Sequence, residues 1–233
     1  MKRVCTVCAR GGSKGLPNKN LRPLMGKPLI AYSLIQAKAS QLFDKIAVSS
    51  DSDEILDLAG KWGADYLVHR PKELATDEAP KLPVIRHCFS ETERLSGEIF
   101  ETAVDLDATS PLRHVEDIRA SVRLLEEKKV SNVLTGSPAR HSPYFNLVET
   151  DERGTVRLIK SWPAAIVRRQ DSPVCYDMNA SVYVWTRRAL LDKPTLFNAD
   201  TLLYVMPAER SWDIDSDLDF KIVSFLMREA ADR

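Results

Sequence analysis

The sequence predicts an α/β fold, a mostly parallel sheet flanked by helices, forming a single domain over residues 1–233. Short apolar segments rich in β-branched residues alternate with helical segments of roughly 10–15 residues, which is the pattern of successive βαβ units. The first apolar segment ends in a glycine-rich loop, at the edge where such sheets bind ligands. A chain of 233 residues with 44% hydrophobic side chains is also large enough to bury the core that this fold requires.

The first half of the chain gives the clearest alternation. Val4–Ala9 is a short apolar run followed by two glycines, as expected of a buried strand that ends in a loop. Pro28 suits the first turn of a helix, and Ser50 and Asp53 have the spacing of a capping box before a second helix. The elements expected after the first strand are a helix from Pro28, a strand at Ile46–Ser49, a helix at Leu56–Trp62, a strand at Tyr66–Val68, a helix at Val84–Leu95, a strand at Thr102–Leu106 and a helix at His114–Glu127.

The alternation breaks in the second half, between residues 140 and 173. Prolines, a turn-forming run at residues 151–154 and alternating apolar residues indicate a hairpin outside the sheet. We interpret residues of about 140–173 as an inserted arm available for contact with a second subunit. The elements expected around the arm are strands at Val130–Thr135, Ser181–Thr186 and Leu202–Met206 and a final amphipathic helix at Leu218–Glu229.

Composition excludes several classes of protein. The 33 basic residues balance 33 acidic ones, which argues against a general nucleic-acid coat or a protein that binds anionic membranes. No apolar run approaches the ~20 residues of a membrane span, and the apolar run near the N-terminus is too short for a signal peptide. Four cysteines do not make a disulfide scaffold, and Cys5 and Cys8 would point to opposite faces of one strand. We therefore expect a cytoplasmic protein.

The loop at residues 9–20 carries the strongest chemical signal. Three glycines allow the backbone to approach a ligand closely, and Arg10, Lys14 and Lys19 add three cations directly after the first strand. Neither the dinucleotide pattern G-x-G-x-x-G nor the P-loop pattern fits this loop. A solvated basic turn is the alternative interpretation. The position of the loop after the first strand favours a cradle for a polyphosphate.

Asp213 and Asp215 form a candidate metal site. Residues two apart on an extended segment project to the same face, and Mg²⁺ is bound by few carboxylates together with substrate phosphates. The alternative is that these acids precede the last helix and interact with its dipole. The residues alone support both interpretations equally, and the adjacent polyphosphate cradle favours the metal.

Several segments resemble one known family, in order and over nearly the whole chain. The matching segments are residues 9–20, Val48–Asp51, Arg70–Asp77, Thr109–Arg113, Asn179 with Tyr183, and Asp213–Asp215. They resemble the acylneuraminate cytidylyltransferases, which make CMP-activated sialic acids. The resemblance implies a Rossmann-like sheet of the nucleotide-diphospho-sugar transferase type. It also implies a Mg²⁺-dependent reaction, in which the anomeric hydroxyl of a nine-carbon 2-keto sugar acid attacks the α-phosphate of CTP and releases pyrophosphate.

The resemblance also implies a role for each matching residue. Arg10 and Lys19 would offset charge on the triphosphate. For the group that takes the hydroxyl proton, Asp215 and a metal-bound hydroxide are two hypotheses of our own, which the resemblance does not decide between. The nucleotide would contact Arg10, Gly12, Ser13, Lys14, Lys19, Asn20 and Arg70. The metal ligands would be Asp213 and Asp215. The sugar side would comprise Asp107, Thr109, Ser110, Arg169, Asn179 and Tyr183, with Arg169 on the arm serving the neighbouring site of a homodimer.

Departures from the family pattern bear on the sugar substrate. Asp107 stands where neuraminate enzymes commonly have glutamine, and an ionised aspartate only accepts hydrogen bonds whereas glutamine also donates. The pocket therefore requires different donors, or Asp107 acts indirectly at the metal. Residues 175–181 and 144–146 differ as well, in ways that resemble bacterial enzymes that activate legionaminic acid. We expect that substrate, with N-acetylneuraminate as the alternative.

Two rival functions are less favoured. Enzymes that activate the eight-carbon acid of lipopolysaccharide carry an arginine where this chain has Lys14 and Gly15. A nucleotide-binding regulatory protein without catalysis would not require the acid pair Asp213 and Asp215.

Overall fold

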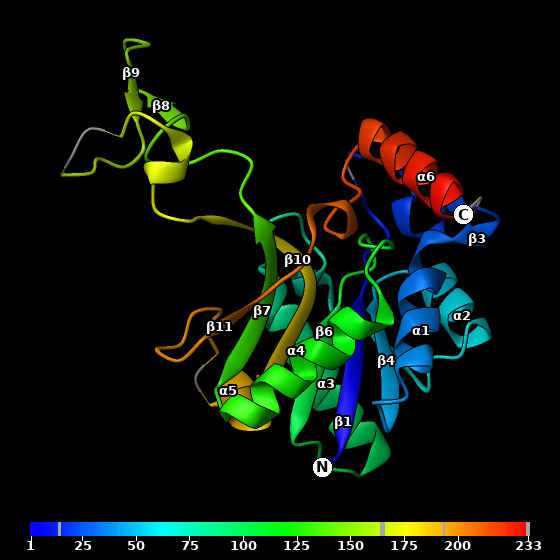
Figure 1. Cartoon of the computed structure of the whole chain (residues 1–233). Helices are drawn as coiled ribbons and strands as arrows, with labels where there is room; N and C mark the ends of the chain where they lie inside the picture. Colours follow the sequence, from blue (N-terminus) through cyan, green and yellow to red (C-terminus); the bar gives the residue numbers. More distant parts are fainter. Residues whose placement is uncertain (14, 164–165, 193, 232–233) are drawn as a thin grey trace.

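The computed structural model describes residues 1–13, 15–163, 166–192 and 194–231, and within these residues the central sheet has seven strands (Figure 1). Their order across the sheet is β11-β7-β10-β6-β1-β4-β5. Neighbouring strands pair in parallel except that β10 runs antiparallel to both β6 and β7. The strands of this sheet are β1 (Arg3–Cys8), β4 (Lys45–Ser50), β5 (Tyr66–His69), β6 (Thr102–Leu106), β7 (Asn132–Pro138), β10 (Tyr176–Thr186) and β11 (Leu202–Val205). The predicted α/β class is therefore confirmed.

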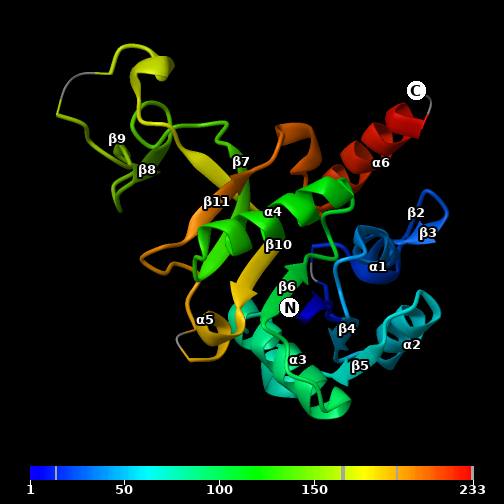
Figure 2. The same ribbon diagram turned by 60° about the horizontal axis from the view of Figure 1, so that its bottom comes forward.

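Helices cover both faces of the sheet. Apolar residues of α1, α2 and α4 share one buried cluster with the strands, whereas α3 and α5 contribute to a second cluster on the opposite face (Figure 2). The last helix, α6, packs on the start of α1 and on the glycine-rich loop in a third cluster. The helices are α1 (Leu29–Ser40), α2 (Asp53–Lys61), α3 (Lys81–Ser96), α4 (Val115–Lys128), α5 (Arg187–Leu191) and α6 (Asp217–Ala231).

One capping prediction is wrong. The N-cap of α2 is Ser52, whose hydroxyl accepts a hydrogen bond from the Ile55 amide at 3.4 Å. The Ser50 hydroxyl instead accepts from the Ser52 amide at 3.1 Å, because Ser50 still belongs to β4. A short hairpin of β2 (Pro23–Leu24) and β3 (Lys27–Pro28), together with α5, is absent from the predicted elements.

The arm leaves the sheet between β7 and β10. Its antiparallel hairpin, β8 (Val148–Thr150) with β9 (Val156–Leu158), stands clear of the sheet and its helices in Figure 1, which confirms the predicted hairpin. Much of the apolar surface of the arm is solvent-exposed, including Leu147, Val148, Val156, Leu158, Ile159, Trp162, Val167 and Val174. Among the described residues, no helix has both the length and the apolar character needed to cross a membrane.

Strand β10 is interrupted by a bulge between Met178 and Tyr183. The bulge is closed by the Thr135 hydroxyl, which donates to Asn179 Oδ1 at 2.6 Å and accepts from the Val182 amide at 3.0 Å. Ala180 lies inside the bulge with a φ of 50°, in the left-handed region that disfavours a β-carbon.

We predict that Ala180→Gly stabilises the protein by roughly 1 kcal/mol, because glycine removes the strain of the left-handed conformation. Chemical denaturation measures the change in the free energy of unfolding. The control is Ala37→Gly in the buried face of α1, which should destabilise by about 1 kcal/mol. Destabilisation by Ala180→Gly would contradict the prediction.

Candidate active site

Most of the predicted site residues meet at the carboxyl ends of β1 and β6. One pocket is lined by the glycine-rich loop, by the segment after β6 and by the segment before α6. A second pocket shares Cys8, Arg10 and Asp107 with the first and extends toward the start of α3. The predicted residues on the first pocket are Arg10, Ser13, Lys19, Asn20, Asp107, Thr109, Asp213 and Asp215, and Arg70 lines the second. Lys14 lies outside the described residues.

The glycine-rich loop packs directly against the segment before α6. A β-carbon at Gly15 would overlap the carbonyl oxygen of Asp215, so only glycine allows this approach. The Lys19 ammonium donates to the Ile214 carbonyl at 2.6 Å and to Asp215 Oδ1 at 2.9 Å. The loop and the acid pair therefore form one wall, although they are about 195 residues apart in the chain.

Asn20 lines the first pocket and carries a side-chain acceptor that is unpaired among the described residues. Its side chain is 5% exposed, and its amide nitrogen donates to the Arg10 carbonyl at 3.0 Å. Among the described residues its Oδ1 is buried without a hydrogen-bond partner. A buried acceptor left in this state is destabilising, so the atom is suited to a donor on a ligand, such as a ribose hydroxyl or a base amino group.

Arg10 and Arg70, the two arginines predicted to contact the nucleotide, have different partners in the structure. Arg10 forms an ion pair with Asp77 at 2.6 Å across the second pocket. Arg70 is 8% exposed and donates to the hydroxyl of Ser49 at 3.2 Å and to its carbonyl at 2.8 Å, which fixes the guanidinium at the end of β4.

The Thr109 hydroxyl lies between the carboxylates of Asp107 and Asp213, and all three residues line the first pocket. Thr109 Oγ1 is 2.7 Å from Asp107 Oδ1 and 2.7 Å from Asp213 Oδ1. A hydroxyl carries one proton, so it donates to only one of these oxygens. The other contact requires an additional proton or a cation.

The pKa values of the two carboxyl groups differ accordingly. Burial, followed by the nearby charge of Asp107, raises the pKa of Asp213 from 3.8 to about 6. Burial would also raise the pKa of Asp107, but the charge and hydrogen bond of Lys81 and the two hydrogen bonds from Thr109 outweigh it and hold this pKa well below its usual value. Asp107 is therefore the more readily ionised of the two, whereas Asp213 binds a proton below about pH 6 and is left to bind a cation above it.

The chemistry of this donor set fits Mg²⁺. Asp213 and Asp215 both line the pocket beside the polyphosphate cradle, and Mg²⁺ needs only one or two carboxylates when phosphates supply further ligands. The described residues include no group of three or more acidic, histidine or cysteine side chains that would bind a metal without a substrate. These carboxylates would therefore bind the ion together with a nucleotide.

The remaining predicted sugar contacts lie deeper or farther away. Ser110 and Tyr183 are buried, and both polar atoms of the Asn179 amide are bonded within the protein, Oδ1 to Thr135 and the nitrogen to Ser211 at 2.9 Å. Arg169 lines a separate pocket at the base of the arm. The roles of these residues in sugar binding stay predictions.

Two residues that donate hydrogen bonds to Asp107 were not identified from the sequence as part of the site. Lys81, the first residue of α3, forms ion pairs with Asp107 at 2.6 Å and with Asp105 at 3.4 Å. Arg113 is 1% exposed and donates to the carbonyls of Asp107 and Ser181, and burial lowers its pKa to about 10. A carboxylate directly after a buried strand requires a counter-charge. The sequence therefore signals that a cation lies close to Asp107, but not that Lys81 is the residue that supplies it.

Comparison with known proteins identifies the family. The family model described as Cytidylyltransferase matches residues 4–205. The chain belongs to the cytidylyltransferase family. It is therefore a nucleotidyltransferase, as the resemblance implied.

Relatives of this cytidylyltransferase include enzymes that act on several sugar acids. The chain is 46% identical to CMP-N,N'-diacetyllegionaminic acid synthase of Campylobacter jejuni, over 96% of this chain and 94% of that protein. It is 43% identical to post-translational flagellin modification protein B of Campylobacter coli, over 97% and 95%. It is 31% identical to N-acylneuraminate cytidylyltransferase of Escherichia coli, over 95% of this chain and 51% of that protein.

A solved structure supports the fold of the cytidylyltransferase independently. The structure of CMP:2-keto-3-deoxy-manno-octonic acid synthetase complexed with CTP superposes with a TM-score of 0.72 at 15% identity. The superposition covers 99% of this chain and 100% of that one. The nucleotidyltransferase type of sheet is thereby confirmed.

We predict that Asp213→Asn stabilises the metal-free protein at neutral pH. A pKa of about 6 in the folded state, above 3.8, means that folding disfavours the ionised form. Wild-type stability therefore falls as pH rises from about 4 to 6. The gain from the substitution should be near zero at pH 4 and reach up to about 3 kcal/mol above pH 6.5.

Urea denaturation in the presence of a chelator, at pH 4 and above pH 6.5, measures this gain in the free energy of unfolding. Asp217→Asn is the control, because Arg22 lowers the pKa of Asp217 and its removal should bring no gain at neutral pH. If Asp213→Asn gave the same gain in the free energy of unfolding at pH 4 as above pH 6.5, the gain would not come from removing a buried ionised carboxylate, and the prediction would be wrong.

Proposed function

We propose that the protein is a Mg²⁺-dependent CMP-nonulosonate cytidylyltransferase. It would transfer CMP from CTP to the anomeric hydroxyl of a nine-carbon 2-keto sugar acid, with legionaminic acid as the substrate, and release pyrophosphate. The observation that carries this proposal is the single wall formed by the basic loop and the acid pair, joined by Lys19. We also propose that the enzyme works in the cytoplasm, where CTP is made.

The nucleotide would bind along the glycine-rich loop. Arg10, Ser13 and Lys19 line the first pocket and would offset the charge of the triphosphate, and Gly12 has open space at its α-carbon for a close approach. The free Oδ1 of Asn20 would accept a hydrogen bond from the nucleoside. Arg70, fixed by Ser49, would face the base from the second pocket.

Catalysis in this proposal depends on positioning and charge. Asp213 and Asp215 would hold Mg²⁺, which when bound supplies positive charge that stabilises phosphate and sugar oxygens. The bond between the sugar oxygen and the α-phosphorus forms while the bond to the pyrophosphate oxygen breaks. Asp215, 77% exposed at the pocket rim, would take the hydroxyl proton. Lys19 and Arg10 would compensate the charge on the departing pyrophosphate.

The choice of sugar rests on the relatives. The 46% identity to a legionaminic acid synthase exceeds the 31% identity to an N-acylneuraminate enzyme and the 29% identity to a pseudaminic acid cytidylyltransferase of Campylobacter jejuni. N-acetylneuraminate is the alternative substrate.

A substrate panel tests the proposal. Pyrophosphate release should require CTP and Mg²⁺ and should be fastest with legionaminate among legionaminate, N-acetylneuraminate, pseudaminate and the eight-carbon acid. Asp215→Asn should lower kcat by about 10²-fold or more while CTP still binds, because a proton acceptor is lost. The matched control, Asp217→Asn, should leave kcat within about twofold, since Asp217 pairs with Arg22 outside the pocket.

The panel also separates the alternatives. A preference for N-acetylneuraminate would keep the reaction and overturn the choice of sugar. CTP binding without pyrophosphate release from any sugar would instead favour the non-catalytic nucleotide-binding protein.

We further propose a homodimer joined through the arms. The exposed apolar residues of β8, β9 and the following loop form a surface that a second copy would cover. Arg169 would then reach the neighbouring active site, because within one chain it lies at the base of the arm.

Subunit complementation tests the shared site. Arg169→Ala and Lys19→Ala should each be nearly inactive, and their mixture, after exchange of subunits, should recover up to about a quarter of wild-type activity. Light scattering should show a dimer that Val156→Glu on the exposed face of β9 converts to a monomer. An active monomer, or no recovery in the exchanged mixture, would contradict the shared site.

A further inference from the structure

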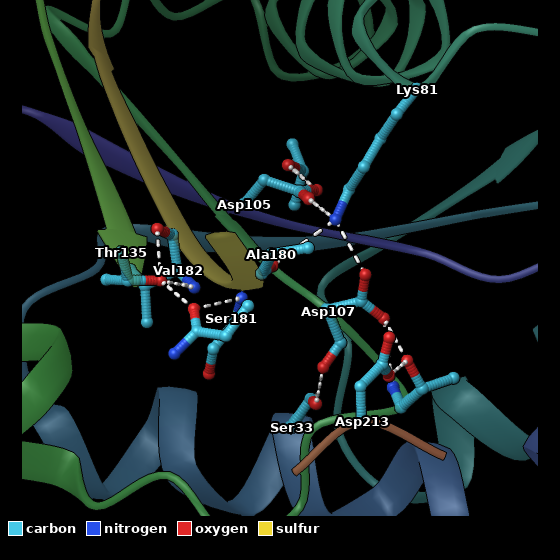
Figure 3. Close-up of polar contacts among 12 residues, drawn as sticks. Ser33, Lys81, Asp105, Asp107, Thr135, Ala180, Ser181, Val182 and Asp213 are labelled. Atoms are coloured by element: carbon cyan, nitrogen blue, oxygen red, sulfur yellow. Dashed lines mark hydrogen bonds and ion pairs between the residues drawn. The ribbon is translucent and has the colours of Figure 1, made fainter. Parts of the chain in front are cut away.

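Lys81 joins two elements of the site that are distant in sequence. Figure 3 shows its side chain extending from the start of α3 to the end of β6 and to Ala180 in the bulge of β10, with the ammonium between Asp105 and Asp107. Its Nζ is 2.6 Å from Asp107 Oδ2, 3.4 Å from Asp105 Oδ2 and 3.4 Å from the Ala180 carbonyl. The same atom lies 4.8 Å from the centre of the Tyr183 ring.

The surroundings of Lys81 make it the counter-charge of two carboxylates. Asp105 is fully buried, and its Oδ1 accepts a hydrogen bond from the Thr6 hydroxyl at 2.8 Å. Among the described residues its Oδ2 has no hydrogen-bond partner and only Lys81 as an ion-pair partner. Removing one member of a buried charge cluster leaves the others uncompensated, which is strongly destabilising.

Asp107 connects Lys81 to Thr109, because each of its two carboxylate oxygens contacts one of these residues. Its Oδ2 is bound by Lys81, while its Oδ1 accepts from both the amide of Thr109, at 3.0 Å, and the hydroxyl of Thr109, at 2.7 Å. The oxygen of that hydroxyl also contacts Asp213 at 2.7 Å. The Thr109 carbonyl accepts from the Ile214 amide at 3.0 Å, so the segment that carries the acid pair is tied to the same residue.

We propose that Lys81 is a positioning residue that orients Asp213 through Asp107 and Thr109. With Oδ2 of Asp107 held by Lys81, its Oδ1 directs the proton of the Thr109 hydroxyl toward Asp107. The lone pairs of the hydroxyl then face Oδ1 of Asp213 at 2.7 Å, an arrangement that a cation bound to Asp213 would stabilise. The inference rests on the proposed function, in which Asp213 binds Mg²⁺ together with CTP.

Direct contact between Lys81 and a substrate is the competing explanation. The Lys81 ammonium donates to Asp107 and to the Ala180 carbonyl, and it also forms an ion pair with Asp105 at 3.4 Å. Asp107 is similarly engaged at both oxygens. The geometry therefore favours an indirect role over the binding of a substrate anion.

The test compares Lys81→Met with Lys45→Met. Lys45 is a matched control, because its side chain is 30% exposed against 31% for Lys81, it pairs with Glu98 at 3.8 Å, and it lies 6.0 Å from the Tyr66 ring. It lies at the start of β4, the end of the strand away from the site. Steady-state kinetics give kcat, both KM values and the Mg²⁺ concentration at half-maximal rate. Calorimetry gives CTP binding with and without Mg²⁺.

Lys81→Met should lower kcat by about tenfold to 10²-fold, as expected when a reacting group is misplaced, and leave both KM values within about threefold. The half-maximal Mg²⁺ concentration should rise, and calorimetry should show a smaller gain in CTP affinity on adding Mg²⁺. Lys45→Met should match wild type in kcat, in both KM values, in the half-maximal Mg²⁺ concentration and in CTP binding. Thr109→Val should reproduce the loss, and the double variant with Lys81→Met should be no worse than the poorer single variant, because residues in one chain of contacts are non-additive.

Lys81→Arg and Thr109→Ser cover the case in which Lys81→Met does not fold. Lys81→Arg keeps the charge but changes the geometry, so kcat should fall while CTP binding without Mg²⁺ stays unchanged. Thr109→Ser keeps the hydroxyl and should therefore lose less kcat than Thr109→Val. Wild-type kcat in Lys81→Arg would overturn the inference. So would an increase in one KM at unchanged kcat in either Lys81 variant, or additive losses in the double variant. Wild-type protein that releases no pyrophosphate would overturn the proposed function, and this inference with it.

Discussion

The site depends on the contact between the glycine-rich loop and the segment before the last helix. Lys19 holds that segment through the Ile214 carbonyl and the Asp215 carboxylate, and Gly15 leaves the space for the Asp215 carbonyl. On its other side the segment is bound by the Thr109 carbonyl. The loop after β1 and the loop after β6 are neighbours because β1 and β6 pair in parallel, which brings their carboxyl ends together. The sheet thus fixes two of the three segments, and Lys19 and Thr109 attach the third.

Charge is distributed unevenly around this contact. The basic loop faces solvent and the pocket, where it would meet an anionic nucleotide, whereas Asp105 is buried and Asp107 partly buried against Lys81. Ionised carboxylates in such a place persist only with a nearby cation. Lys81 helps to hold the pKa of Asp107 well below its usual value, whereas burial raises the pKa of Asp105 in spite of the same ammonium. Among the described residues Asp213 forms no ion pair, and its burial together with the nearby charge of Asp107 raises its pKa to about 6. A carboxyl group in that state is suited to exchange its proton for a divalent cation when a nucleotide brings further ligands.

Much of the fold could be predicted from the sequence, because local patterns determine it. Each predicted strand and long helix is present, with ends that differ by a few residues, since helix ends depend on the capping group and Ser52 rather than Ser50 caps α2. The antiparallel direction of β10 could not be predicted, because it depends on the arm returning to the end of the sheet at which β7 finishes, where Tyr176 pairs with Pro138. The cradle and the acid pair could be located because they lie in segments with a distinct composition. Lys81 could not, because at the start of a helix it has the pattern of a solvated cation, and only the tertiary fold brings it to Asp107.

A crystal structure with CTP and Mn²⁺ in place of Mg²⁺ tests the central claim most directly, because anomalous scattering locates the metal. The account predicts Mn²⁺ bound by Asp213 and Asp215 and by phosphate oxygens, with a nucleoside donor bonded to Oδ1 of Asn20. The triphosphate should lie along Arg10 and Lys19. A metal bound away from both aspartates, or a nucleotide that leaves Asn20 without a partner, would contradict it.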